Sequence, residues 1–388
     1  MTEILVLVGL VVAVFVGFNI GGSNTGVAFG PAVGSRTVSK LGAGVLMGIF
    51  ALFGGWTVGR RVVTTLGSDL IIGDPFTVAA SVVILLFIGL ALFVSNLFGI
   101  PASTSMTAVG AVAGYGLATD RLAVQLIMEI VSWWLVAPIL GFWLSAVVGR
   151  YVYDDIASVV AIDRSDGPLV ILRRDGVVPV PALGAGTTPR ELTGSLLVVA
   201  IGCFMAFSAG ASNVANAVAP LVGNGSLSMN AGILLAGGAI AIGALTIARR
   251  TLETMGNELT ELPLTAALVV ATVSATLVTV LSLLGIPASF VVIATMSTVG
   301  LGWGRETTRE RSYPVADPAT LAGPTRSGIE TVAAGRDSAD TSLDVDEPAT
   351  LYRPVTTARV IFMQNIVPAV ATVGAYSVFS YVELAAVM

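Results

Sequence analysis

The chain has 388 residues, of which 55% are hydrophobic and 11% are charged, with a formal net charge of −5 and a mean hydropathy of +0.91. Soluble domains carry about 25% charged residues, so this composition excludes a soluble protein and indicates one that crosses a membrane several times. Histidine is absent and Cys203 is the single cysteine, which excludes intrachain disulfides, Cys/His metal sites and histidine general-base catalysis.

Hydrophobic runs long enough to cross about 30 Å of hydrocarbon recur along the whole chain. We expect spans near residues 4–20, 41–58, 77–98, 122–149, 193–209, 230–247, 264–284 and 358–385. Two further apolar runs, 103–118 and 287–303, follow Gly-Ile-Pro sequences, and either full spans or re-entrant hairpins fit them. The pattern predicts an all-α polytopic membrane protein with about 10–12 membrane segments.

A polar, glycine-rich motif occurs twice, as FVGFNIGGSNTGVAFGPAVGS at 15–35 and FMAFSAGASNVANAVAPLVGN at 204–224. Two more blocks recur in the same order. GRRVVTTLGSDL (59–70) resembles ARRTLETMGNEL (248–259), and LFGIPAS (97–103) resembles LLGIPAS (283–289). Five segments in each half reverse the second half relative to the first, so we predict an inverted-topology repeat with broken helices and re-entrant hairpins.

Two polar stretches divide the chain, and arginines flank both of them. The predicted parts are a first membrane repeat (1–149), a cytoplasmic linker (150–191), the first part of the second repeat (192–303), a flexible acidic cytoplasmic loop (304–357) and a final transmembrane helix (358–388). The positive-inside rule places linker and loop in the cytoplasm, and counting crossings from there puts both termini outside. A small strand hairpin is expected in the linker around Arg173-Arg174-Asp175-Gly176.

The strongest candidates for chemistry are the Ser-Asn pairs of the two motifs, Ser23-Asn24 and Ser212-Asn213. Each pair follows glycines that we expect to break the helix and to free N–H groups, which suit an anion, while the side-chain oxygens suit a small cation. Asn216 extends the second copy, and Val27 is its counterpart in the first. The alternative is that both motifs are only close-packing helix interfaces.

A second candidate is the hydroxyl run Ser103-Thr104-Ser105, which follows Gly99-Ile100-Pro101. Serine and threonine at a helix start cap freed N–H groups, and their hydroxyls can donate to phosphate or sulfate oxygens. The counterpart in the second half is Ser289-Phe290-Val291, where only Ser289 keeps a hydroxyl. Ordinary capping of a broken helix is the alternative for each of these residues.

Glu129 is an acidic residue within an apolar span. Such acids often mark an ion or proton path, although a neighbouring helix can also satisfy them. The sequence has no GxxxxGK[ST] loop, which argues against transport driven by the chain's own ATP hydrolysis. It also has no nucleophile constellation and no nucleic-acid-binding signature, so we expect neither an enzyme nor a nucleic-acid partner.

The repeated motif resembles a known family signature. GGSNTGVAFGPAVGS and GASNVANAVAPLVG are similar to the duplicated GANDVANxxGxxVGS of the inorganic phosphate transporter (PiT) family, and GIPASTSMTAVGAVAG is similar to its GLPVSTTH segment. The resemblance covers nearly the whole chain apart from the two polar stretches. It implies a secondary transporter of the cell membrane that moves inorganic phosphate with Na⁺ or H⁺ and that could form a homodimer.

The departures from the family pattern bear on substrate and coupling ion. The family's Asn-Asp pair falls on Ser23-Asn24 and on Ser212-Asn213, so both aspartates are replaced by asparagine, and Met106 stands where histidine often follows. Asparagine can ligate Na⁺ only without charge. The loss of two carboxylate acceptors favours sulfate, which carries no proton, and the segment NIGGSNTGVAFG looks like the sulfate-permease branch of the family. The second copy keeps Val-Ala-Asn-Ala, and phosphate is the family's commonest substrate.

We therefore expect an importer of inorganic phosphate coupled to Na⁺ or H⁺, working by alternating access in the lipid bilayer. A H⁺-coupled sulfate permease is the alternative, followed by a passive anion channel. The expected substrate-binding residues are Ser23, Asn24, Ser103, Thr104, Ser105, Ser212, Asn213, Asn216 and Ser289. The expected residues for the coupling ion are Asn24, Asn213 and Glu129, with no other cofactor or metal.

Overall fold

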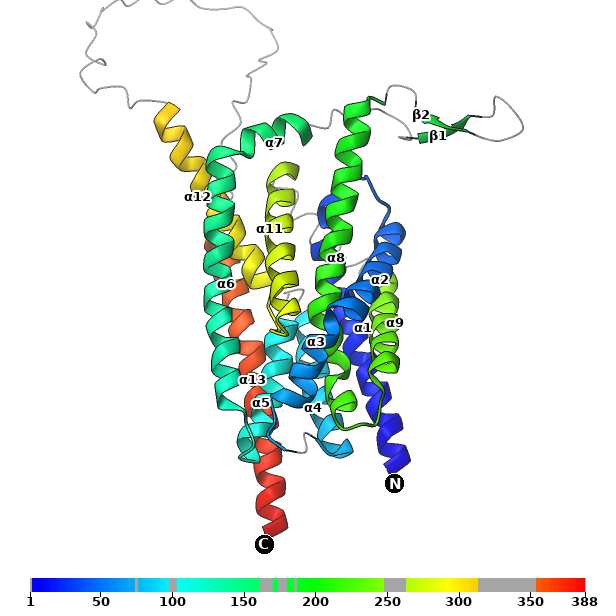
Figure 1. Cartoon of the computed structure of the whole chain (residues 1–388), viewed down its shortest axis with the longest axis vertical. Helices are drawn as coiled ribbons and strands as arrows, with labels where there is room; N and C mark the ends of the chain where they lie inside the picture. The colour runs from blue at the N-terminus through cyan, green and yellow to red at the C-terminus, as the bar shows by residue number, and fades with distance from the viewer. Residues whose placement is uncertain are drawn as a thin grey trace, which may run out of the picture.

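Long helices lying side by side make up most of the computed structural model, which describes residues 2–73, 76–97, 103–160, 170–173, 180–184, 187–247, 263–312 and 354–387 (Figure 1). In the first half these are α1 (Thr2–Gly34), α2 (Lys40–Thr57), α3 (Gly59–Thr64), the π-helix η1 (Thr65–Asp69), α4 (Val78–Leu97), α5 (Thr104–Ala118) and α6 (Val124–Tyr151). The second half contains α8 (Pro189–Gly223), α9 (Met229–Thr246), α11 (Leu264–Leu283), α12 (Phe290–Ser312) and α13 (Pro354–Val387). Between the halves lie α7 (Tyr153–Val160) and the strands β1 (Val170–Arg173) and β2 (Val180–Leu183).

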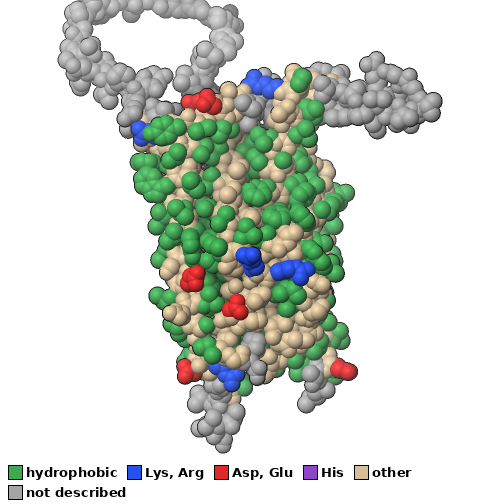
Figure 2. All heavy atoms as spheres, in the orientation of Figure 1, with side chains coloured by type: hydrophobic (Ala, Val, Ile, Leu, Met, Phe, Trp, Pro, Cys, Tyr) green, Lys and Arg blue, Asp and Glu red, His purple; other side chains and the backbone are tan. Residues whose placement is uncertain are grey.

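The described residues contain 8 helices that are long and apolar enough to cross a membrane, namely α1, α2, α4, α6, α8, α9, α11 and α13. On the face shown in Figure 2, apolar side chains are spread over the length of the bundle, and charged side chains between them are few. The predicted fold class, an all-α polytopic membrane protein, is confirmed. Each predicted span corresponds to one of these helices.

Gly285-Ile286-Pro287 lies at the turn of a re-entrant hairpin formed by α11 and α12, whereas Gly99-Ile100-Pro101 lies outside the described residues. α4 rises from one end of the bundle and α5 returns to that same end, whereas α11 and α12 do the same from the opposite end (Figure 1). The runs predicted at 103–118 and 287–303 are therefore second arms of hairpins and not separate full spans. The two hairpins point toward each other inside the bundle.

The packing of the helices follows the repeat. α1 packs against α9, and its counterpart α8 packs against α2. In the same way, α6 packs along α12, and its counterpart α13 packs along α5. Each half thus places its motif helix and its last helix against elements of the other half. This exchange gives the bundle the inverted repeat that the sequence predicts. The second copy of the Arg-Arg block, 248–259, lies outside the described residues.

The glycines of the duplicated motif serve helix packing. α1 and α8 stay helical through both motifs, so the helix breaks predicted there are wrong. A Cβ atom on Gly21 would overlap the carbonyl oxygen of Ile240, and one on Gly210 would overlap that of Ala51. Because a neighbouring helix needs this space, the glycines allow two backbones to meet while the helical hydrogen bonds remain intact.

α7, the strands β1 and β2 and the C-terminal end of α12 lie at one end of the bundle, and the start of α1 and the end of α13 lie at the other (Figure 1). β1 and β2 pair antiparallel, Val170 with Leu183, which confirms the strand hairpin predicted in the linker. α12 continues to Ser312 and α13 begins at Pro354, so the predicted 304–357 loop is helical at both edges. Gly304 explains the first extension, because it packs closely on the Ala146 carbonyl of α6.

Candidate functional site

The second copy of the motif places a polar face at the centre of α8. Ser212, Asn213 and Asn216 are 0%, 3% and 1% exposed, although they lie within a membrane-spanning helix. Polar side chains at such depth need partners from neighbouring segments, since the hydrocarbon supplies none.

The partners come from the tip of the first hairpin. Thr104 Oγ1 donates a hydrogen bond to Asn213 Oδ1, and Ser105 Oγ lies 3.0 Å from Ser212 Oγ. Asn216 Nδ2 also donates to Asn213 Oδ1, at 3.0 Å. One amide oxygen therefore accepts from both the hairpin and its own helix, and the hydroxyl run predicted at the start of α5 is part of the site.

The tip of the second hairpin reaches the same point. Ser212 Oγ donates to the backbone oxygen of Ala288 at 3.0 Å, so Ser105 is the donor in the contact between the two serines. Ser212 is thus in contact with both hairpins at once, and the sequence-predicted residues of the second motif meet those of the first hairpin.

Two helix N-termini converge on this face of α8. Ser103 caps α5 by accepting from Met106 N at 3.2 Å, and Ser289 accepts from Val292 N at 3.4 Å in the first turn of α12. These serines occupy corresponding positions of the repeat. The first-turn N–H groups of a helix have no intrahelical acceptor, and the helix dipole is positive at this end. The arrangement is one that binds an anion.

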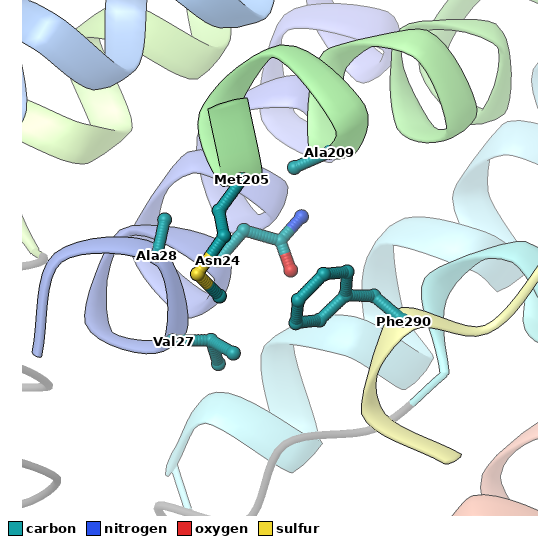
Figure 3. Close-up of a pocket in the computed structure, with 6 residues that line it drawn as sticks. All are labelled: Asn24, Val27, Ala28, Met205, Ala209 and Phe290. Carbon is teal, nitrogen blue, oxygen red and sulfur yellow. The ribbon is translucent and has the colours of Figure 1, made fainter. Parts of the chain in front are cut away.

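The first copy of the motif is placed differently. Ser23 Oγ donates to Ile20 O of its own helix at 3.3 Å, so it joins neither hairpin through this bond. Asn24 is half-buried, and its buried Nδ2 atom has no hydrogen-bond partner among the described residues. Its amide points toward the ring of Phe290 and toward Ala209 (Figure 3).

A small cavity of about 10 Å³ lies beside Asn24. It is lined by Asn24, Val27, Ala28, Met205, Ala209 and Phe290. Asn24 is the one polar residue of this lining, which comes from α1, α8 and the tip of the second hairpin (Figure 3).

The site has two half-sites, one on α8 around Asn213 and one on α1 around Asn24, and two residue differences make them unequal. Phe290 corresponds to Thr104, and Val27 corresponds to Asn216. On the α8 side the polar pair closes the site with hydrogen bonds, whereas on the α1 side the apolar pair leaves the Asn24 amide facing a cavity.

The second hairpin tip is held by side chains that sequence reasoning did not select. Trp134 Nε1, on α6, donates to Pro287 O at 2.8 Å. Ser289 Oγ donates to Gln364 Oε1 of α13 at 3.5 Å, and Arg61 Nη1 donates to Leu283 O at the end of α11. Gln364 could have been selected from the sequence, because it is a polar residue within an apolar helix. No sequence feature distinguishes Trp134 from a tryptophan that only packs against its neighbours.

The first hairpin is held in a comparable way. Asn96, at the end of α4, donates through Nδ2 to both the backbone oxygen and Oδ1 of Asn19, each at 3.1 Å. Both asparagines lie in apolar spans, so the rarity of amides at membrane depth could have identified them.

Glu129 is not part of the cluster. It lies on the exposed face of α6, away from the hydrogen-bonded residues of α5 and α8. Among the described residues, no group of three or more His, Cys, Asp or Glu could hold a metal ion. The side chains that meet at the hairpin tips are neutral, so charge in a ligand must be balanced by dipoles or by a second ligand.

The chain resembles known transporters in sequence and in fold. Residues 20–333 match the phosphate transporter family. The chain is 32% identical over 303 residues to the sulfate permease CysP of Bacillus subtilis, covering 77% of each protein. A solved structure described as the sodium-dependent phosphate transporter shares the fold, with a TM-score of 0.68 over 98% of this chain and 99% of that one, at 16% identity.

Proposed function

Because this chain belongs to the phosphate transporter family, we propose that it is a secondary active transporter that imports inorganic phosphate across the cell membrane. The observation that carries the proposal is the meeting of two helix N-termini, those of α5 and α12, at Ser212 of α8. A tetrahedral oxyanion at this point receives N–H groups from two directions.

Binding of the anion uses donors that already face the site. The first-turn N–H groups of α5 and α12 supply the positive ends of two helix dipoles. The amide of Asn24, whose Nδ2 has no hydrogen-bond partner among the described residues, adds a side-chain donor. Since these groups are fixed by the fold, they need little reorganisation when the anion arrives.

The coupling ion is Na⁺ or H⁺, and the neutral oxygens of the cluster favour Na⁺. Asn216 Oδ1 is buried without a partner, close to Asn213, whose Oδ1 gathers several donors. Amide and hydroxyl oxygens are suitable ligands for a hard cation. Without a carboxylate the site holds a cation only weakly, so phosphate charge and cation charge would support each other's binding.

Alternating access follows from the two hairpins. They enter from opposite ends of the bundle, and both touch Ser212. Movement of one hairpin away from α8 opens the site to one side while the other hairpin keeps it closed to the opposite side. A passive channel would instead need a continuous pore past both tips.

Sulfate is a second candidate substrate. Asparagine stands at positions 24 and 213, so the cluster lacks a carboxylate that would accept the proton of a phosphate ion. Sulfate has no proton to donate at neutral pH. The 32% identity to a sulfate permease supports this candidate independently.

The test is uptake of labelled phosphate and labelled sulfate, side by side, into proteoliposomes with imposed Na⁺ or H⁺ gradients. Saturable phosphate uptake driven by Na⁺ supports the main proposal, and sulfate uptake driven by H⁺ with poor competition by phosphate supports the second. A substrate current that does not saturate with concentration, and that flows without a Na⁺ or H⁺ gradient, would show a channel instead. Production of free phosphate from labelled esters would show an enzyme.

Topology and assembly complete the proposal. Both chain ends would lie outside the cell and the polar stretches inside. Cysteine scanning of the ends with impermeant reagents tests the orientation, since the native Cys203 is buried. The mass of the purified protein in detergent tests the homodimer that the resemblance implies.

A further inference from the structure

The cavity beside Asn24 is an apolar counterpart of the closed polar half-site. Four of its lining side chains, Ala28, Met205, Ala209 and Phe290, are buried, with 4–8% exposure. Their surfaces are methyl and methylene groups, a thioether sulfur and an aromatic ring. Asn24 contributes the one polar group of the lining.

Corresponding residues of the two motifs differ in size beside the cavity. Ile20 occupies in α1 the position that Ala209 occupies in α8, and Ile20 is fully buried. Ala209 has the smaller side chain, and it lines this space. Val27 and Phe290 then replace the polar Asn216 and Thr104, so this space is lined by apolar groups.

This lining is poorly suited to an oxygen atom of a dianion. An anionic oxygen placed here would lose its water and would gain donors from Asn24 alone, which is costly for a charged acceptor. A sulfur substituent is different, because sulfur is larger, more polarisable and a weaker hydrogen-bond acceptor. Sulfur also makes favourable contacts with aromatic ring edges, and Phe290 presents its ring to the cavity (Figure 3).

We propose that this cavity accepts the sulfur atom of a thio-substituted tetrahedral oxyanion, thiosulfate or thiophosphate. The three oxygens then face the first-turn N–H groups of α5 and α12, while the sulfur lies against Phe290 and Met205. The inference rests on the proposed function, since it concerns the same site and adds a substrate class to it.

The test is competition for uptake into proteoliposomes. For the parent anion that is taken up, sulfate or phosphate, the matching thio anion is compared with selenate or arsenate, which are larger than the parent but carry four oxygens. We expect the thio anion to inhibit at lower concentration than the four-oxygen analogue, and labelled thiosulfate to enter when sulfate does.

Substitutions in the cavity test whether the polarisable sulfur of the ligand, and not the size of the ligand, is recognised. Phe290→Thr, which copies Thr104, should weaken inhibition by the thio anion by about 2- to 10-fold more than it weakens inhibition by the parent anion. Met205→Thr should also weaken inhibition by the thio anion. Phe290→Leu, which keeps an apolar side chain, should weaken it less. Phe53→Thr, on the exposed side of α2, is the matched control.

Equal inhibition by the thio anion and by selenate or arsenate would overturn the inference, as would an equal effect of Phe290→Thr on thio and parent anions. Either result leaves the proposed function standing, because uptake of the parent is still observed. Absence of uptake for every labelled oxyanion would overturn both.

Discussion

Thr104 Oγ1 donates a hydrogen bond to Asn213 Oδ1, and this bond joins the hairpin of one repeat to the motif helix of the other. Thr104 is the first residue of α5, so the bond fixes the N-terminus of that helix against α8. The corresponding residues, Phe290 and Asn24, lie beside the cavity and cannot form the same bond. The site is therefore closed on one side and open on the other.

Removal of the Thr104 hydroxyl should impair transport. Thr104→Val keeps the shape of the side chain but removes the donor to Asn213, and a buried hydrogen bond is worth about 1 kcal/mol. We expect uptake at low substrate concentration to fall by about 5- to 10-fold. Thr276→Val, which removes an exposed hydroxyl bonded within α11, is the control. Equal activities of the two variants would contradict a role for the bond.

A carboxylate at position 213 should strengthen the dependence on Na⁺. Asn213 Oδ1 already accepts from Thr104 and Asn216, and a carboxylate oxygen would accept there as well. A buried charge without a partner is costly, so Asn213→Asp should unfold at lower temperature without Na⁺ and recover when Na⁺ is added. Thermal unfolding in sodium and choline salts measures this. Recovery by choline would argue against a cation site.

The close crossing of α2 and α8 should not tolerate a methyl group. A Cβ on Gly210 would overlap the Ala51 carbonyl, so Gly210→Ala should destabilise the protein by about 1–3 kcal/mol or prevent assembly. Gly238→Ala is the matched control, because a Cβ there meets no atom within 4 Å. Yield and thermal unfolding of the two variants, measured side by side, decide the point.

Loss of the indole donor at Trp134 should free the tip of the second hairpin. Trp134→Phe keeps an aromatic ring but removes the indole N–H and its 2.8 Å hydrogen bond to Pro287 O. We expect uptake to fall several-fold, with increased proteolytic or exchange accessibility of residues 284–289. Trp143→Phe, on the same helix but 53% exposed, is the control. If the accessibility of residues 284–289 is unchanged in Trp134→Phe, packing alone holds the tip.

Substitution of Glu129 discriminates between coupling ions. Its exposed position on α6, outside the cluster, predicts that Glu129→Gln keeps Na⁺-driven uptake. Uptake under an imposed pH gradient is measured in the same vesicles. If the gradient drives uptake in the native protein and no longer does so in the variant, Glu129 carries the proton, and coupling through the Ser and Asn oxygens is contradicted.

Much of the fold could be predicted, because lipid imposes simple rules on sequence. A span needs about 20 apolar residues, so the eight long helices were visible as hydropathy alone. Ser212 could be selected because a Ser-Asn pair recurs at corresponding positions of both motifs, and Ser105 because it belongs to a run of hydroxyls after a Gly-Ile-Pro block. Their 3.0 Å contact agrees with that selection.

The prediction of broken helices at the motifs failed for a specific physical reason. Glycine both weakens a helix and lets another backbone approach, and the sequence cannot tell which effect is used. At Gly21 and Gly210 a carbonyl of the crossing helix occupies the space of the missing side chain. Tertiary packing therefore keeps both helices intact, and the chain reverses at the hairpin tips instead.

The sequence by itself determined the repeat, the spans and the residue types that meet at the hairpin tips, because these follow from hydropathy and from matched positions. Only the tertiary structure decided which faces they occupy. It placed Glu129 outside the cluster, brought Met205 and Ala209 beside Asn24, and put Phe290, the sequence counterpart of Thr104, against the cavity. The direction in which a side chain points depends on how the helices cross, and the crossings are set by contacts between segments far apart in the chain.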